Sequence, residues 1–219
     1  YERTLVEALE EENFFRSLAT VIQTSSGDRK IPIVASKGEA KWIDEEAAYP
    51  ESDDSFGQIS ISAYKVATMI KVSDELLNDN VFNLEAYISK EFGRRIGTKE
   101  EEAFFTGDGK GKPTGIFNAT GGASDGVTTA GASITFDDVM DLFYSLRSPY
   151  RKKAVWMLND STVKALRKLK DGNGNYIWQP SVQAGVPDMI LNRPYFTSSF
   201  VPEIAAGQKI MAFGDFSYY

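Results

Sequence analysis

The sequence predicts an α+β protein organised around one long helix. Three observations support this fold class: a helical repeat of apolar residues over 83–105, strand-like runs at 30–35 and 59–72, and alternating short helices and strands after residue 133. With 219 residues, 42% of them hydrophobic, the chain can bury a substantial core. We therefore expect a globular protein of one large or two moderate domains.

Residues 2–23 are predicted to form an acidic amphipathic arm. Between residues 2 and 23, apolar side chains alternate with glutamates, which is typical of an amphipathic segment that has little to bury against on its own. Residues 25–28 break this pattern. A strand at 30–35 follows, with Pro32 suited to a sheet edge.

Residues 36–56, which we name the extended arm, are acidic and polar. A compact domain rarely contains so long a loop without structure of its own. The only large apolar residues in the extended arm are Trp42, Ile43, Tyr49 and Phe56, and we predict that they contact another molecule. A disordered surface loop is the alternative that composition leaves open.

A long strand is predicted over residues 59–72. Ile59 and Ile61 follow one alternation, whereas the apolar residues from Tyr64 onward follow the other. This change of phase predicts a bulge or twist between the two parts. Ser73 is then expected to cap a short helix.

The helix over residues 83–105 is the longest predicted element. Its apolar stripe repeats every four residues, at Leu84, Ile88, Phe92 and Ile96. Asn83 is the expected N-cap, and Gly107 is the expected stop. Gly93 and Gly97 indicate either close packing of another backbone or two tolerated glycines.

A Gly-, Thr- and Ala-rich boundary at 107–131 separates this helix from the second half of the chain. Thr135 and Asp138 have capping-box spacing and begin a helix that Pro149 is expected to stop. The remaining expected elements are a strand at 154–158, a helix from 160 or 161 to 169, a tight turn at 171–175, and strands at 176–178, 189–191, 195–197 and 210–213.

The composition excludes several kinds of chemistry. The chain has no cysteine and no histidine, which excludes thiolate nucleophiles, Ser-His-Asp triads and Cys/His zinc sites. A net charge of -7 argues against nucleic-acid binding as the main function, although residues 151–153 form a local basic patch. Since there is no apolar run of about 18 residues and no apolar leader, we predict neither a transmembrane helix nor a signal peptide.

Three motif-like stretches are better explained without a ligand. GDGKGKPT at 107–114 resembles a phosphate loop, but Thr106 replaces the first Gly and Pro113 replaces the magnesium-binding Ser or Thr. DGNGNY at 171–176 begins like a calcium loop but lacks the Gly and the Glu that complete one. The acidic clusters at 44–46 and 51–54 have little apolar surface to raise a pKa, so solvated charge is favoured over a glycosidase pair. We therefore predict no catalytic residue, no cofactor and no metal.

The order of these stretches resembles the major capsid proteins of tailed bacteriophages, the Hong Kong ninety-seven type fold. The resemblance rests on KIPIVA, AKWIDEE, PESDDSFGQISI, VSDELLND, FFTGDGKGKPTGIF, ITFDDVMDLFYSL, WMLNDSTVKALRKLKDGNGNYIWQP, GVPDMILNRPYFTSSFVP and IMAFGDFSYY. Each stretch alone is weakly specific, but their succession covers nearly the whole chain.

The resemblance implies four parts. These are the N-terminal arm at 1–30, an extended-loop hairpin at 31–72, a peripheral domain at 73–132 that carries the spine helix 83–105, and an axial domain at 133–219. It also implies a C-terminal return to the peripheral domain after residue 219. In this family, a phage protease often removes an N-terminal scaffolding segment.

The resemblance further implies a structural protein and not an enzyme. The expected function is that of a major capsid subunit of a tailed phage or prophage, which assembles through pentamers and hexamers into an icosahedral shell around double-stranded DNA. The expected location is the virion, after assembly in the host bacterial cytoplasm. Expected partners are other copies of the chain, a scaffold, a maturation protease and a portal, with non-specific DNA contact and no membrane.

A covalent cross-link is a further property of some members of this family, which use a Lys on the extended loop. No Lys lies between Trp42 and Phe56, which leaves Lys41 at the base of the loop as the candidate. Three alternatives to the capsid function remain at this point: an encapsulin-like nanocompartment shell, a carboxylate-dependent hydrolase and a monomeric α+β binding module.

Overall fold

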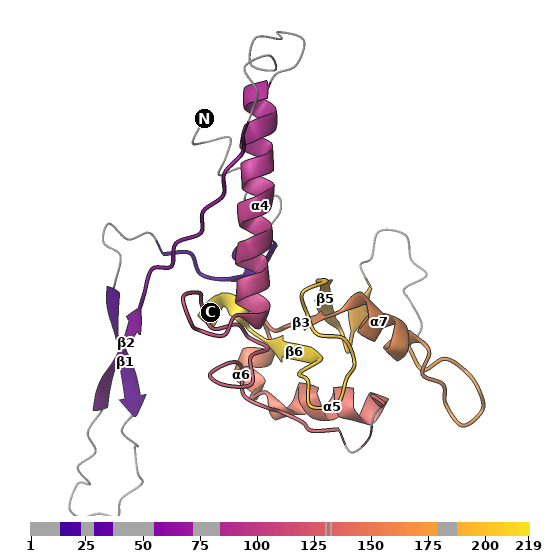
Figure 1. The fold of residues 1–219 in the computed structure, drawn as a ribbon. Helices are drawn as coiled ribbons and strands as arrows, with labels where there is room; N and C mark the ends of the chain where they lie inside the picture. The colour runs from indigo at the N-terminus through magenta and orange to yellow at the C-terminus, as the bar shows by residue number, and fades with distance from the viewer. Residues whose placement is uncertain are drawn as a thin grey trace, which may run out of the picture. The chain divides into compact units, whose positions relative to one another are not determined.

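The computed structural model describes residues 14–22, 29–36, 55–71, 84–129, 131, 133–178 and 188–219 (Figure 1). The chain divides into two compact units. One comprises residues 22–64, and the other comprises residues 1–21 together with 65–219.

The smaller unit is built on a two-stranded antiparallel hairpin of β1 (Arg29–Ser36) and β2 (Ser55–Ile61). The strand predicted at 30–35 is therefore confirmed. The strand predicted at 59–72 is wrong in its bounds, because β2 ends at Ile61 and residues 62–71 form neither helix nor strand. The strand β2 ends at Ile61 because Ile61 pairs with Arg29, the first residue of β1, and β1 offers no further residue with which residues 62–71 could pair.

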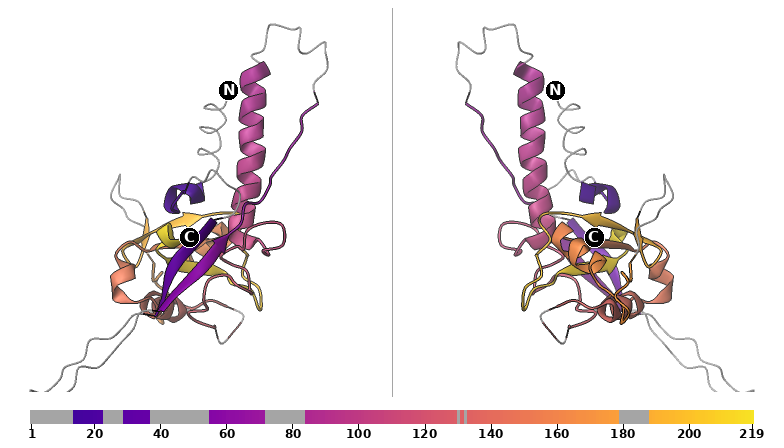
Figure 2. Two further views of the ribbon diagram at one scale, coloured as in Figure 1. Left: turned by 90° about the vertical axis from the view of Figure 1, so that its left-hand side faces the viewer. Right: turned by 90° about the vertical axis from the view of Figure 1, so that its right-hand side faces the viewer.

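Helix α4 (Leu84–Thr106) confirms the predicted long helix and is the most extended element of the larger unit (Figures 1 and 2). The predicted apolar stripe, however, is only half-buried. The buried line runs along a neighbouring face, again at every fourth residue: Ser89, Gly93, Gly97, Glu101 and Phe105. Both glycines thus lie on the buried face of α4, where a missing side chain lets neighbouring atoms approach closely.

A four-stranded mixed sheet forms the centre of the larger unit, in the order β4-β5-β3-β6. Strand β3 (Val155–Leu158) pairs in parallel with β5 (Arg193–Thr197) and antiparallel with β6 (Met211–Gly214). The short β4 (Met189–Ile190) pairs with β5 at the edge of the sheet. Leu191 and Asn192, at φ 47° and 60°, make the tight turn between them, so β5 begins two residues earlier than predicted.

Helix α7 (Asp160–Arg167) provides the crossover between the parallel strands β3 and β5. The side chain of Asn159 caps it by accepting a hydrogen bond from the Ser161 N–H at 2.9 Å. Helix α5 (Phe136–Ser145) begins with the predicted capping box at Thr135. Pro149 does not stop α5 directly, because α5 ends at Ser145 and the proline lies in the first turn of α6 (Ser148–Arg151).

Two hydrophobic cores meet at β3, because alternate residues of a strand point to opposite faces. Trp156 and Leu158 belong to a core shared with α5 and α7. Met157 belongs to a second core, which we name the aromatic core: Phe15, Phe105, Ile116, Phe117, Met157 and Val201. Phe15 comes from the short helix α2 (Phe14–Leu18) and Phe105 from the end of α4.

The segments after α7 and after β6 contain short local structures. The turn at 171–175 is confirmed by the hydrogen bonds that close it. The strand predicted at 176–178 is wrong, since only an isolated bridge pairs Tyr176 with Lys170. A single 3-10 turn, η1 (Phe216–Tyr218), follows β6.

Candidate functional site

The hairpin of β1 and β2 is the first candidate for a site that needs a partner. A two-stranded hairpin is at best marginally stable alone in water. Paired residues share one face of a ribbon, and the register pairs Ile31 with Ile59 while it pairs Lys30 with Ser60. Apolar pairs occur in both sets of register positions, because Val34 pairs with Phe56 in the same set as Lys30 and Ser60. The hairpin therefore carries apolar residues that a partner could cover.

Most of the extended arm lies outside the described residues. Trp42, Ile43, Tyr49 and the candidate cross-linking residue Lys41 belong to that part, so their predicted roles stay predictions. Phe56 lies in β2 at the position paired with Val34. Whether Phe56 contacts another molecule also stays a prediction.

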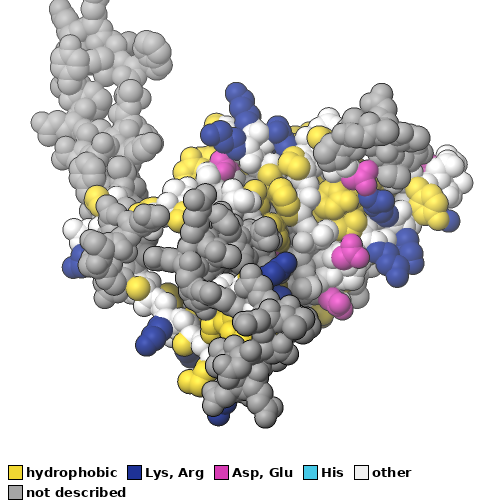
Figure 3. All heavy atoms as spheres, turned by 90° about the horizontal axis from the view of Figure 1, so that it is seen from above, with side chains coloured by type: hydrophobic (Ala, Val, Ile, Leu, Met, Phe, Trp, Pro, Cys, Tyr) yellow, Lys and Arg dark blue, Asp and Glu magenta, His cyan; other side chains and the backbone are white. Residues whose placement is uncertain are grey.

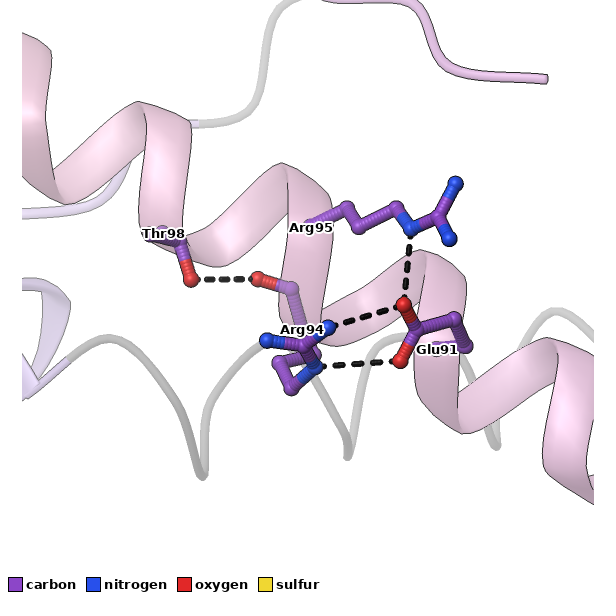
Figure 4. Close-up of polar contacts among 4 residues, drawn as sticks. All are labelled: Glu91, Arg94, Arg95 and Thr98. Carbon is purple, nitrogen blue, oxygen red and sulfur yellow. Dashed lines mark hydrogen bonds and ion pairs between the residues drawn. The ribbon is translucent and has the colours of Figure 1, made fainter. Parts of the chain in front are cut away.

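The exposed side of α4 carries a network of paired charges (Figure 4). Arg95 Nε and Arg94 Nη2 both donate to Glu91 Oε1, at 2.7 Å and 2.8 Å, and Arg94 Nε donates to Glu91 Oε2 at 3.0 Å. The hydrogen bonds from Arg94, and next those from Arg95, lower the pKa of Glu91 from 4.5 to about 2. One turn further on, Lys99 pairs with Glu102 at 2.6 Å.

On the opposite side of α4, a buried carboxylate forms a hydrogen bond with another segment of the same unit. Glu101 is 6% exposed and accepts a hydrogen bond from Ser198 Oγ at 2.9 Å. The Ser198 N–H donates in turn to the carbonyl of Leu158 at the end of β3. This link was missed in the sequence because Glu101 stands in an acidic run typical of a solvated face. Its spacing of four from Gly97 and from Phe105 is the signal that could have revealed it.

A short aromatic helix fastens the N-terminal segment to the same end of α4. Phe15 is fully buried, and its ring centroid lies 5.5 Å from that of Phe105 and 5.1 Å from that of Tyr219. Arg16 pairs with Glu100 of α4, with 3.1 Å between Nε and Oε2. Thr20 Oγ1 donates to the carbonyl of Ser217 at 2.5 Å. These contacts tie α2 to α4 and to the residues after β6.

The GDGKGKPT stretch closes on itself directly after α4. An added Cβ at Gly107 would lie 2.0 Å from the Pro113 carbonyl oxygen, and one at Gly115 would lie 2.5 Å from the Phe105 backbone. The Lys110 N–H donates a hydrogen bond to the carboxylate of Asp108 at 3.1 Å. The loop is therefore a compact connection that follows α4.

The described residues offer little that resembles a catalytic centre. A cavity of about 70 Å³ between α5, α7 and β4 is lined by Phe136, Val139, Leu166, Ile177, Trp178, Ile190 and Leu191, none of which titrates. Among the described residues, no group of three or more acidic side chains is placed to hold a metal. Asp171 accepts hydrogen bonds from the N–H groups of Asn173 and Asn175, which makes residues 171–175 a side-chain-closed turn.

The surface seen along α4 is a mixture of residue types. Basic and acidic side chains of the described residues are interspersed there with hydrophobic ones (Figure 3). No helix in the described ranges combines the length and the apolar character needed to cross a membrane.

Comparison with known proteins identifies the family. The phage capsid family matches residues 1–219. The major capsid protein of Klebsiella oxytoca phage phiKO2 is 24% identical over 207 residues, which is 90% of this chain and 47% of that protein. The major capsid protein of Enterobacteria phage HK97 is 25% identical over 64% of this chain and 36% of that protein. The chain thus spans about half the length, or less, of these relatives.

Solved structures agree in fold. The capsid of a native GTA particle superposes with a TM-score of 0.80 at 30% identity, covering 93% of this chain and 73% of that one. The Mycobacterium phage Bobi structure superposes with a TM-score of 0.66 at 18% identity, covering 94% and 69%. The mixed helix-and-sheet fold described above is thus shared by phage capsid structures, and the chain belongs to the phage capsid family.

Proposed function

We propose that this chain is the assembling part of a major capsid subunit of a tailed phage or prophage. Copies form pentamers and hexamers that tile an icosahedral shell around double-stranded DNA. The observation that carries this proposal is the match of nearly the whole chain, at a TM-score of 0.80 and 30% identity, to the capsid of a GTA particle. No sign of the encapsulin-like alternative comes from the comparisons reported above.

The build of the chain suits such a role. The larger unit has a closely connected interior, because β3 is shared by two cores and the Glu101 to Ser198 hydrogen bond links α4 to the residue after β5. The smaller unit is a hairpin that carries apolar pairs, such as Ile31 with Ile59 and Val34 with Phe56, and has no second layer among its described residues. A body of this kind with an arm that lacks a core of its own is what tiling by overlap requires.

In this proposal, the extended arm lies on a neighbouring copy. Trp42, Ile43, Tyr49 and Phe56 are its contact residues, since aromatic and large aliphatic side chains supply most of the energy of protein interfaces. Lys41 is the candidate for a covalent link if one forms. The division into an arm at 1–30, a hairpin at 31–72, a peripheral domain at 73–132 and an axial domain at 133–219 belongs to the same proposal.

The proposed partners follow from the same role. They are other copies of the chain, a scaffold, a maturation protease and a portal, with packaged DNA contacted non-specifically because a net charge of -7 repels phosphates. The proposed location is the virion shell after assembly in the bacterial cytoplasm. The role is structural, and a glycosidase screen in which turnover is lost on Glu46→Gln would contradict it.

Expression of the full-length gene product and negative-stain microscopy test the proposal. We expect closed shells, rings of five or six, or sheets. A Trp42→Ala and Tyr49→Ala double variant should lower the yield of assembled particles at least tenfold, whereas Tyr176→Ala, which truncates an exposed tyrosine on a turn, should not. A homogeneous monomer under all conditions would contradict the proposal.

A further inference from the structure

We propose that a basic surface around α6 receives the acidic extended arm of a second copy of this chain. The inference rests on the proposed function, in which the extended arm lies on a neighbour, and it names the surface that the arm contacts. We name this surface the α6 basic surface. Its five cations are Arg147, Arg151, Lys152, Lys153 and Arg193.

The structure gathers these five cations in one place. Four of them lie within seven consecutive residues around α6, and Arg193 joins them because its Nη1 donates to the Lys152 carbonyl at 2.8 Å. Arg151 Nε donates to the Leu146 carbonyl at 2.7 Å. Arg147, Lys152 and Lys153 are exposed, and the other two are half-buried.

The α6 basic surface has no acidic counterpart in the part of its unit that the structure describes. Among the described residues, none of its five cations forms an ion pair. Cations elsewhere do form ion pairs with carboxylates, among them Arg94, Arg95, Lys99, Arg167 and Lys209. Five clustered, unneutralised positive charges repel one another. On a chain with a net charge of -7, such a cluster indicates a surface that meets an anionic partner.

Exposed aromatic rings border the same surface. Tyr144 is 67% exposed, Tyr150 is 43% exposed and Tyr218 is 77% exposed. The ring centroids of Tyr150 and Tyr218 lie 5.8 Å apart, and the Arg151 guanidinium lies over the Tyr144 ring at 5.1 Å. Tyrosine and arginine are both enriched at protein interfaces.

The extended arm has the complementary chemistry. Between residues 42 and 56 it carries six carboxylates and no Lys or Arg, and its central AAYP stretch could pack against exposed tyrosines. The six carboxylates are Asp44, Glu45, Glu46, Glu51, Asp53 and Asp54. This segment cannot neutralise its own charge. Every copy supplies one arm and one α6 basic surface, so the two are present in equal number.

Packaged DNA is the other polyanion that a capsid protein meets. The acidic arm is favoured over DNA for an electrostatic reason. The net negative charge of the chain repels an additional polyanion such as DNA. The arm is already part of that net charge, and its docking on the cations neutralises it. Aromatic rings beside the cations fit a peptide with apolar residues better than the phosphate backbone of a duplex.

Charge exchange in the full-length protein tests the contact. The surface variant carries Lys152→Glu and Lys153→Glu, and the arm variant carries Glu45→Lys and Glu46→Lys. Each alone should lower shell yield about tenfold or more at 0.15 M salt, with a smaller loss at 1 M salt, where charges are screened within about 3 Å. All four changes in one chain should restore assembly. The control pair Lys164→Glu and Lys168→Glu, which alters two exposed lysines elsewhere, should assemble normally.

Mixing the two variants shows whether the contact joins different copies. If the arm docks on a neighbour, co-expressed surface and arm variants should assemble better than either alone, because each reversed surface can then receive a reversed arm. Rescue within one chain but not in the mixture would place the contact inside one copy and overturn the proposal. Normal assembly of the surface variant with loss of retained DNA would assign the surface to phosphates. If the wild-type protein forms no shells, the proposed function itself fails.

Discussion

Truncation of Phe15 should separate the N-terminal segment from the rest of the subunit. The side chain is fully buried although it belongs to a helix of only five residues. Its ring meets four others, those of Phe104, Phe105, Phe216 and Tyr219, with ring centroids 5.1 to 5.9 Å apart. Phe15 therefore joins three segments that are distant in sequence: α2, the end of α4 and the residues after β6.

The expected cost of Phe15→Ala follows from this burial. Removal of a fully buried phenylalanine destabilises a domain by about 3–5 kcal/mol, through lost transfer free energy and through the cavity left behind. Relaxation of α2 can reduce the cavity, because short terminal helices shift more easily than central strands. We therefore expect a value of about 3 kcal/mol, at the lower end of that range.

Urea denaturation of unassembled subunits measures this cost. For a slope of about 2 kcal/mol per molar urea, a loss of about 3 kcal/mol lowers the midpoint by about 1.5 M. Val21→Ala is the control, since Val21 is 61% exposed and its truncation should change the free energy of unfolding by less than about 0.5 kcal/mol. A loss below about 1 kcal/mol for Phe15→Ala would refute the placement of Phe15 in the aromatic core.

Three further substitutions test other parts of the structure. Gly115→Ala should prevent or severely weaken folding, because the added Cβ would lie 2.5 Å from the Phe105 backbone. Gly172→Ala is the control in thermal melts and should be tolerated, because its Cβ would meet no atom within 4 Å. Thr135→Ala should cost about 1 kcal/mol in denaturant unfolding, since it removes the capping box of α5, and full stability would contradict that cap. Because the pKa of Glu91 is lowered from 4.5 to about 2, its ion pairs stabilise the folded state above pH 4.5, and this stabilisation is lost as the pH falls toward 2. The melting temperature of Glu91→Gln should therefore fall less steeply than that of the wild-type protein between pH 4.5 and pH 2. An equal slope for the two proteins would show that the ion pairs contribute nothing to stability.

Local signals in the sequence were sufficient to predict most elements. The long helix, the capping box at Thr135 and the strand at 154–158 each depend on neighbours within a few residues, and the structure has all three. The buried face of α4 could not be predicted in the same way. The apolar residues predicted one face, but tertiary packing buries a neighbouring face that carries Ser, Gly and Glu. The buried Glu101 is accommodated because its carboxylate accepts a hydrogen bond from Ser198.

Long-range pairing limited the rest of the prediction. Residues 62–71 have the alternation of a strand, but β1 has no residue left to pair with them, and alternation alone does not reveal whether a partner exists. The contacts of the extended arm also depend on a partner that the sequence alone does not reveal. The contacts predicted for Trp42, Ile43, Tyr49 and Phe56 depend on a second copy, so neither the sequence nor one isolated subunit contains both sides of the interface.

The position of the extended arm in assembled particles tests the central claim most directly. Cryo-electron microscopy of particles formed by the full-length protein should show residues 36–56 on a neighbouring copy, with Trp42 and Tyr49 buried against that copy. Density that places the same residues within their own subunit, around a closed pocket lined by acidic side chains, would contradict the proposed role as a shell subunit.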